Sequence, residues 1–207
     1  MPLVSASPTR MELLRLKKRT VLAKRGHKLL KDKQDELVRI LFVLLEGLKE
    51  LRQRVEKELT ESVKRFVLAR SFMEPEEVEE LFLVPSVKTG IEIRDKKIMT
   101  VIVPVFESKF EGDFISYSFA TTSPELDISL ESLFKAYNDL IELAEKEKTL
   151  ELLAIEIEKT RRRVNALEYI LIPELESTVK FISMKLSEIE RSDITRLMKI
   201  KDIVRAH

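Results

Sequence analysis

Hydrophobic residues recur at intervals of seven over two long segments of the chain, one towards each end. The repeat of the first segment consists of Leu16, Ala23, Leu30, Leu37, Leu44 and Leu51. The other seam position of the same heptads is occupied by Leu13, Thr20, His27, Gln34, Leu41, Leu48 and Val55. Heptads sustained over this length favour a coiled coil over a helix that lies on a sheet.

The first segment has a clear helix start and no internal break. Pro8 and Thr9 precede the repeat, and Glu12 lies three residues after Thr9, which is the pattern of a capping box. No proline occurs from Thr9 to Glu74. We therefore expect one N-terminal long helix over residues 9–74.

The second repeat predicts a C-terminal long helix over residues 124–205. Its apolar positions are Leu143, Leu150, Ile157, Val164 and Leu171, and the stripe resumes at Leu175, Ile182 and Ile189. The step of four residues from Leu171 to Leu175 is a stutter that locally unwinds a supercoil. Pro173 lies within that step and has no backbone N–H to donate, so we expect the helix to bend there.

The segment between the two repeats, residues 75–123, follows different patterns. Pro75 begins a short predicted helix that ends near Pro85. Residues 91–93, 98–106 and 114–120 are rich in β-branched and aromatic side chains, and Glu111-Gly112-Asp113 resembles a turn. These features predict a short helix followed by a small β-hairpin, with Pro104 at an edge position or a bulge.

Together these elements predict an all-α dominated fold, a long antiparallel two-helix coiled coil with the short helix and hairpin inserted in the middle. We expect residues 1–207 to form a single elongated unit. If both termini lie at one end, pairing Leu16 with Ile200 places Leu51 near Asn165 and Ser71 near Glu145.

Composition agrees with long helices, because 35% of the 207 residues are charged and only four are glycine. The absence of cysteine excludes disulfides and zinc–thiolate sites. The most apolar run, Leu37 to Leu45, contains Arg39 and is shorter than the ~20 residues that cross a bilayer. Met1 to Thr9 lacks the apolar core of a secretory signal, so we expect a soluble protein.

Catalytic patterns are missing from the sequence. The glycines, Gly26, Gly47, Gly90 and Gly112, do not have the spacing of a phosphate-binding loop. We interpret His27 as a polar seam residue that sets register, rather than as a metal ligand with His207. The acidic pairs, such as Glu76-Glu77, are expected on solvated helix faces. We expect no catalytic residue, no metal and no cofactor.

Basic residues dominate from Arg10 to Lys33, where only Glu12 and Asp32 oppose them. A second basic cluster is Arg161-Arg162-Arg163. Such residues suit an acidic protein surface or nucleic acid, but no interleaved aromatics or groove-reading fold support nucleic-acid binding. The seam at this end is polar at Thr20, His27 and Gln34, which suggests a tip that works within another protein.

Longer stretches of the sequence resemble a known family. The N-terminal stretch runs from Pro8 to Leu37 and includes Ala23-Lys24-Arg25-Gly26-His27. The C-terminal stretch begins Arg162-Arg163-Val164-Asn165-Ala166-Leu167-Glu168-Tyr169 and continues through Pro173 to Lys201. In this order they resemble the D subunit, the central rotor shaft of V-type and archaeal A-type ATPases. The resemblance covers essentially the whole chain, although residues 86–122 carry little of it.

The resemblance implies a central-stalk protein that transmits torque and is not itself an enzyme. It implies that the paired terminal helices enter a ring of catalytic A and B subunits. It also implies the small F subunit on the shaft, the socket-forming C subunit at the foot, and a cytoplasmic location at the periphery of the membrane. The parent machine would be a proton- or sodium-translocating ATPase or ATP synthase.

Under this interpretation the basic surface near the termini provides the candidate rotor–stator contacts, which are Arg10, Arg15, Lys18, Arg19, Arg25 and Lys28. Two other interpretations use the same features. A coiled-coil scaffold or adaptor would share the heptads, and a basic nucleic-acid-binding coiled coil would use the basic end and show salt-sensitive affinity.

Overall fold

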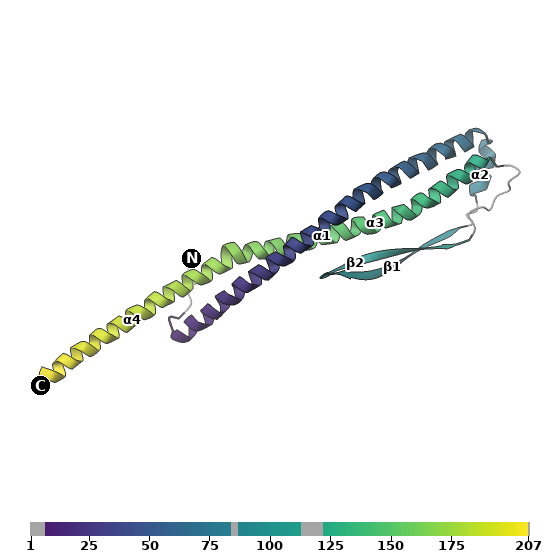
Figure 1. Cartoon of the computed structure of the whole chain (residues 1–207). Coiled ribbons are helices and arrows are strands. Elements are labelled where there is room, and N and C mark those ends of the chain that lie inside the picture. The colour runs from purple at the N-terminus through teal and green to yellow at the C-terminus, as the bar shows by residue number, and fades with distance from the viewer. Residues whose placement is uncertain (1–6, 84–86, 113–121, 207) are drawn as a thin grey trace. The chain divides into compact units, whose positions relative to one another are not determined.

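The computed structural model describes residues 7–83, 87–112 and 122–206. The elements are α1 (Arg10–Ser71), α2 (Pro75–Phe82), β1 (Lys88–Ile98), β2 (Val101–Glu111), α3 (Pro124–Asn165), the π-helix η1 (Ala166–Leu171) and α4 (Ile172–Ala206) (Figure 1). The predicted fold class is confirmed, since long N- and C-terminal helices flank a short helix and a hairpin. Two compact units are distinguished, a first unit of residues 1–36 and 157–207 and a second unit of residues 37–156.

One half of the predicted capping box is observed at the N-terminus of α1, whereas the backbone N–H of Thr9 donates to the carbonyl of Ser7 at 2.9 Å. The backbone N–H of Glu12 donates to Oγ1 of Thr9 at 3.2 Å, which satisfies one of the free donors of the first turn. The Glu12 carboxylate lies 3.7 Å from the Arg15 guanidinium, on the next turn. The helix therefore begins immediately after Thr9.

In the first unit, α1 and α4 pack antiparallel around three buried side chains, Leu16, Leu175 and Ile182. The partly buried side chains around this cluster are Leu13, Ala23, Leu171, Val179 and Leu186. Ion pairs join the two helices of the coil on its surface. Their members are Arg10 with Glu190 at 2.6 Å and Lys24 with Glu176 at 2.6 Å. In addition, His27 Nε2 lies 3.4 Å from Oε2 of Glu168 in η1.

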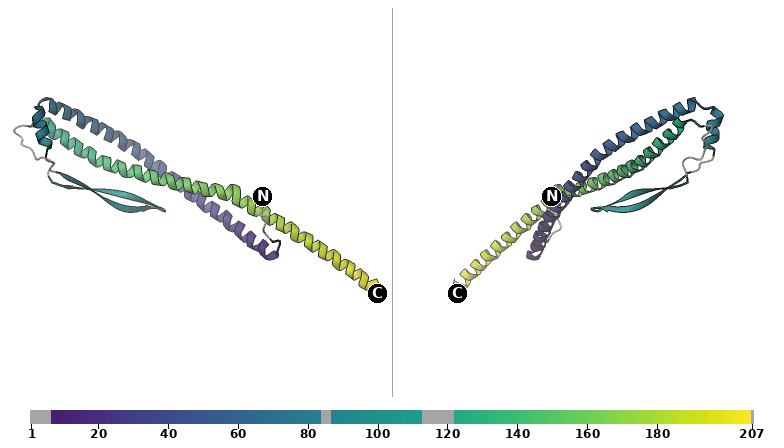
Figure 2. Two further views of the ribbon diagram at one scale, coloured as in Figure 1. Left: turned by 180° about the vertical axis from the view of Figure 1, so that it is seen from behind. Right: turned by 45° about the vertical axis from the view of Figure 1, so that its right-hand side comes forward.

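The predicted pairing of Leu16 with Ile200 is wrong, because Leu16 packs against Leu175 and Ile182 instead. The heptad pattern predicts which residues face the seam. It does not predict the axial register, because sliding one helix by whole heptads leaves the same residues in the seam. The cross-helix ion pairs are consistent with the observed register. As a result, α4 extends beyond the start of α1, as both views of Figure 2 show.

The irregularity predicted around Pro173 takes the form of a π-helical turn. Residues Ala166–Leu171 are π-helical, and the N–H of Ile172 donates to the carbonyl of Leu167, five residues back. Pro173 cannot donate, and its ring crowds the carbonyl four residues earlier. The wider turn lets the helix continue through the proline without ending.

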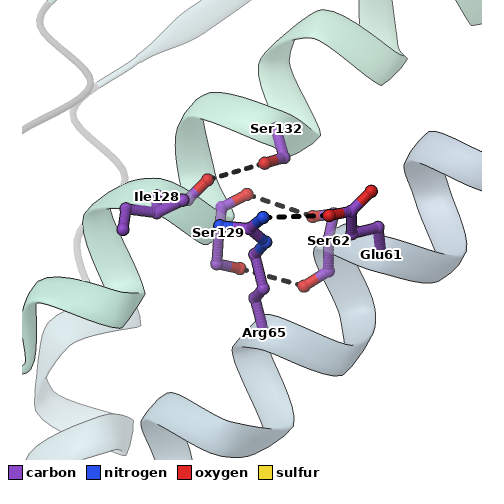
Figure 3. Close-up of polar contacts among 6 residues, drawn as sticks. All are labelled: Glu61, Ser62, Arg65, Ile128, Ser129 and Ser132. Carbon is purple, nitrogen blue, oxygen red and sulfur yellow. Dashed lines mark hydrogen bonds and ion pairs between the residues drawn. The ribbon is translucent and has the colours of Figure 1, made fainter.

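In the second unit, the seam continues past Val55 with small residues. Ser62 and Ala69 of α1 and Ser129 and Ala136 of α3 are buried. The Ser62 hydroxyl donates to the Ser129 carbonyl at 3.0 Å, and the Ser129 hydroxyl donates to the Ser62 carbonyl at 3.2 Å (Figure 3). Each hydroxyl thus bonds the backbone of the other helix, which requires the two helices to approach closely.

The hairpin is confirmed, but its predicted strand limits are wrong. Ile98 ends β1 and pairs with Val101, so the chain turns at Met99 and Thr100. Met99 has a φ of 52°, a left-handed conformation that glycine or asparagine usually occupies in such turns. Without either residue the turn left no signal in the sequence. The predicted strand over 114–120 lies outside the described residues, as does Asp113 of the predicted turn.

One edge of the hairpin lies against α3 (Figure 2). Val101 and Val103 of β2 are buried, and the ring of Phe110 contacts Phe134 edge-on with centroids 4.8 Å apart. The backbone N–H of Phe106 donates to Oε2 of Glu145 on α3 at 2.9 Å. Pro104 lies two residues earlier on this same edge, where a missing N–H costs no ladder bond, so its predicted edge position is confirmed.

Candidate partner-binding surface

The six basic residues proposed as contacts all project into solvent from the N-terminal turns of α1. Arg10 is bonded to Glu190 and Arg15 lies near Glu12. The remaining four, which form no ion pair with any described residue, are Lys18, Arg19, Arg25 and Lys28. A group of such cations on one helix attracts acidic surfaces.

Exposed apolar side chains lie among these cations. They are Met11, Leu14, Val21, Leu22 and Leu29. None of them falls on the Leu16–Leu30 seam series, so they face away from α4 rather than into the core. Sequence reasoning missed them as a surface. Their signal was available, because apolar residues outside the seam positions of a coiled coil have no core to enter.

The C-terminal part of α4 is a second apolar surface, and no described helix lies opposite it. Every residue from Ser187 to Arg205 is exposed. The large apolar side chains in this stretch are Ile189, Ile194, Leu197, Met198, Ile200, Ile203 and Val204. With 3.6 residues per turn, the set from Ile194 to Val204 covers more than half of the helix circumference. So much exposed apolar surface on one helix indicates a binding site.

The predicted seam residues differ in how deeply they are placed. Leu16, Leu37, Leu51, Val164, Leu175 and Ile182 are buried. Ala23, Leu30, Leu44, Leu150, Ile157 and Leu171 are half-buried. Ile189 is 47% exposed, because it lies where α4 leaves its contact with α1. Leu153 and Thr160, which alternate with Leu150 and Ile157 in the heptads, are fully buried.

Two of the polar seam residues have hydrogen-bond partners, Thr20 within α1 and His27 on η1. Thr20 Oγ1 donates to the carbonyl of Leu16 at 2.9 Å, and His27 lies beside Glu168. A single His–Glu contact is an inter-helix bond. Within the described ranges, no group of three or more His, Asp or Glu side chains is arranged to hold a metal ion.

The acidic and arginine clusters are surface features. Glu76, Glu77, Glu79 and Glu80 are exposed on α2, and Arg161, Arg162 and Arg163 are exposed on α3, where Arg162 bonds Glu158. In the parts of the chain that the structure describes, no helix has a stretch long and apolar enough to cross a membrane. The exposed apolar surfaces of the first unit described above are the outward face of α1 and the end of α4.

Comparison with known proteins agrees with the resemblance seen in the sequence. Residues 12–202 match the family described as the D subunit of ATP synthase. The V-type ATP synthase D subunit of Clostridium botulinum (strain ATCC 19397 / Type A) is 52% identical over 206 residues, which cover 97% of this chain and 95% of that protein. The protein of the same description from Thermoanaerobacter sp. (strain X514) is also 52% identical, and 99% of each chain is covered.

Proposed function

The chain belongs to the family of ATP synthase D subunits, and we propose that it is the non-catalytic central-stalk (rotor) subunit of a V/A-type rotary ATPase. In this role it transmits torque between the ring of A and B subunits, which hydrolyses or makes ATP, and the ion-translocating ring in the membrane. Its further partners are the F subunit on the shaft and the socket-forming C subunit at the foot. The complex holds it on the cytoplasmic side, peripheral to the membrane.

The observation that carries this proposal is the exposed apolar end of α4. A single flat partner would cover one side of a helix, whereas these side chains extend around more than half of it. A cavity that surrounds the helix end buries them all. Burial of each large side chain contributes roughly 1.5–3 kcal/mol, so the set supplies ample binding free energy.

The outward face of α1 adds the electrostatic part. Lys18, Arg25 and Lys28 stand among the exposed Leu14, Val21 and Leu29. Acidic loops inside a ring would meet cations that pair with no described residue of this chain. Contacts of this kind steer association and select partners more than they add affinity.

The packing of each unit supports the proposed torque transmission. Seam side chains locked among residues of the other helix resist sliding and twisting of the pair. The helix pair is also asymmetric, since one side carries the cations of α1 and α4 continues alone. Similar catalytic interfaces around it would therefore meet different surfaces, and rotation would bias each interface in turn between conformations.

The first experiment measures assembly. The chain is produced with the A and B subunits of its own complex, and its retention on the ring and the ATPase rate are measured. Replacing Ile194, Leu197 and Ile200 with asparagine should weaken retention at least about tenfold, because more than roughly 1.4 kcal/mol of apolar burial is lost. The melting temperature of the isolated chain should change little, since these side chains are already in water.

The electrostatic contribution has its own variant and control. Reversal of Lys18, Arg25 and Lys28 to glutamate should reduce retention on the ring, and the loss should shrink at high salt. Reversal of Lys49, Lys57 and Lys64, exposed lysines of α1 in the second unit, is the matched control. Equal loss in both triples would contradict the assignment of the contact to the N-terminal turns.

A second experiment separates a rotor from a static scaffold. Because the chain has no cysteine, a single cysteine at Leu197 can be cross-linked to a cysteine placed in the ring. A rotor predicts that ATP hydrolysis stops on cross-linking and returns on reduction. A cross-linked complex that hydrolyses ATP at its full rate would favour the scaffold interpretation.

A further inference from the structure

The free edge of the hairpin is identified by the direction of its backbone groups. In an antiparallel ladder, residue pairs alternate between exchanging hydrogen bonds and pointing them away from the partner strand. Ile98 and Val101 flank the two-residue turn and form a bonded pair, so Ile93 and Phe106 form a non-bonded pair. The Phe106 N–H does point away from β1, because it bonds Glu145 of α3.

The same alternation fixes the groups on β1. The N–H and carbonyl groups of Ile91, Ile93, Asp95 and Lys97 point away from β2, towards the outer edge of β1. α3 covers the opposite edge of the hairpin through Glu145 and through Asn138, whose Oδ1 lies 3.4 Å from the Ser108 hydroxyl. On β1, every residue from Lys88 to Lys97 is exposed.

This edge lacks most of the devices that usually protect an edge strand. β1 is 11 residues long, its register with β2 is unbroken by a bulge, and it contains no proline. Its exposed apolar side chains lie on one face, where Ile91 is 52% exposed, Ile93 is 66% exposed, and Ile102, across from Lys97, is 62% exposed. An added strand would therefore find both backbone groups and an apolar face.

The charges of β1 select the strand that fits. Arg94 is paired with Glu107 at 3.0 Å, and Glu92 is paired with Lys109. Lys88, Lys96 and Lys97 form no ion pair with the described residues. Among the acidic residues of β1, only Asp95 likewise forms no ion pair with a described residue. The edge thus carries net positive charge, which opposes pairing with a second copy of itself and favours an acidic strand.

We propose that the outer edge of β1 binds an extended acidic segment of another protein of the assembly, which adds to the hairpin as a third strand. The segment places apolar side chains beside Ile91 and Ile93, and carboxylates beside Lys96 and Lys97. Main-chain hydrogen bonds to alternate residues hold it in register. Because the segment comes from the same assembly, this inference rests on the proposed function.

The test is residue-resolved hydrogen exchange of the full chain, alone and assembled with the co-produced soluble subunits of its complex. The outward amides, Ile91, Ile93, Asp95 and Lys97, should exchange at least roughly tenfold more slowly in the complex. The inward amides of Glu92, Arg94 and Lys96 bond β2 in both states and should not change. Equal slowing of both sets would indicate side-chain burial without strand addition and would overturn the proposal.

A proline variant tests the backbone contact itself. Asp95→Pro removes an outward N–H opposite Pro104 and leaves the ladder bonds intact, so the inward amides should stay protected while the slowing of Ile93 and Lys97 is lost. Asp95→Ala, which also removes the charge, should keep the slowing. Slowing that survives in Asp95→Pro would overturn the proposal.

The charge requirement is tested with Lys96→Glu combined with Lys97→Glu, which should abolish the slowing in the complex. If exchange of the outward β1 amides in the isolated chain slows as the chain concentration rises, β1 pairs with a second copy of itself, and the proposal of an acidic partner segment is overturned. If the chain assembles but the outward amides of β1 do not exchange more slowly than the inward ones, this inference is overturned and the proposed function stands. A chain that does not assemble would overturn both.

Discussion

The serine pair between α1 and α3 predicts a large cost for adding volume at a position that looks minor in the sequence. Ser62 and Ser129 are each 2% exposed, and each hydroxyl reaches the carbonyl of the other helix. In Ser62→Val, a methyl group replaces Oγ at a site where the carbonyl oxygen of Ser129 lies 3.0 Å away. A second methyl is added beside it. The helices must then move apart or the side chain must leave its preferred rotamer.

The expected magnitude has two parts. Loss of the buried hydrogen bond costs about 1 kcal/mol. Overpacking of a tight site costs a further 1–3 kcal/mol or so. At roughly 2–4 °C per kcal/mol for a chain of this size, the melting temperature should fall by about 5–15 °C. Ser62→Ala loses the same bond but adds no volume and gains helix propensity, so it should cost only about 0.5 kcal/mol.

The assay is thermal and urea unfolding followed by circular dichroism. Ser187→Val makes the same chemical change at an exposed position of α4 and should stay within about 0.5 kcal/mol of the parent chain. If Ser62→Val unfolds like Ser187→Val, the close approach of the helices is refuted. If Ser62→Ala costs as much as Ser62→Val, the hydrogen bond and not the packing dominates.

Three further predictions concern single groups. Thr160 Oγ1 is buried without a hydrogen-bond partner among the described residues, so Thr160→Val should raise the free energy of unfolding by roughly 1 kcal/mol. Thr178→Val loses a 2.7 Å hydrogen bond to the carbonyl of Glu174 and should lower the free energy of unfolding. Urea unfolding of the two variants measures both changes. Met99→Gly should remove the strain of the left-handed backbone and stabilise the hairpin by ~1 kcal/mol. Hydrogen exchange of the hairpin amides should then slow about fivefold. A hydrogen bond from Lys135 lowers the pKa of Glu131, so Lys135→Met, which removes both the donor and the charge, should raise the midpoint of the Glu131 carboxyl resonance in an NMR titration. An unchanged midpoint would contradict that cause.

The fold class followed from the sequence because two of its signals are strong. Heptads over many turns and the order of the elements identified the helices, and Thr9 with Glu12 marked the start of α1. The axial register did not follow. The heptad pattern is satisfied equally well when Leu16 faces any of several apolar residues of α4. The ion pairs of the observed register, such as Lys24 with Glu176, do not identify it in advance, because each charged residue has many possible partners of opposite charge in the sequence.

Small residues and unusual turns were missed for a related reason. Ser62 and Ser129 continue the heptads of Val55 and Leu143, but a serine in a seam position does not register as core by hydrophobicity. The turn at Met99 contains none of the residues that favour its backbone, so no sequence signal separated β1 from β2. In both cases tertiary contacts determine the conformation, and local preference does not.

The candidate contacts were found in part, since the basic residues were visible as a charge asymmetry while the apolar ones were assigned to a seam or ignored. That division has a physical basis. A charge run stands out in any window, but Leu197 becomes informative only once the register shows that no described helix covers it. The shift from Ile200 to Ile182 as the partner of Leu16 is what leaves the end of α4 bare. The error in the predicted register and the failure to predict the exposed end of α4 therefore have the same cause. The side chains of α4 that pack against no described helix of this chain are those that the proposed ring must cover.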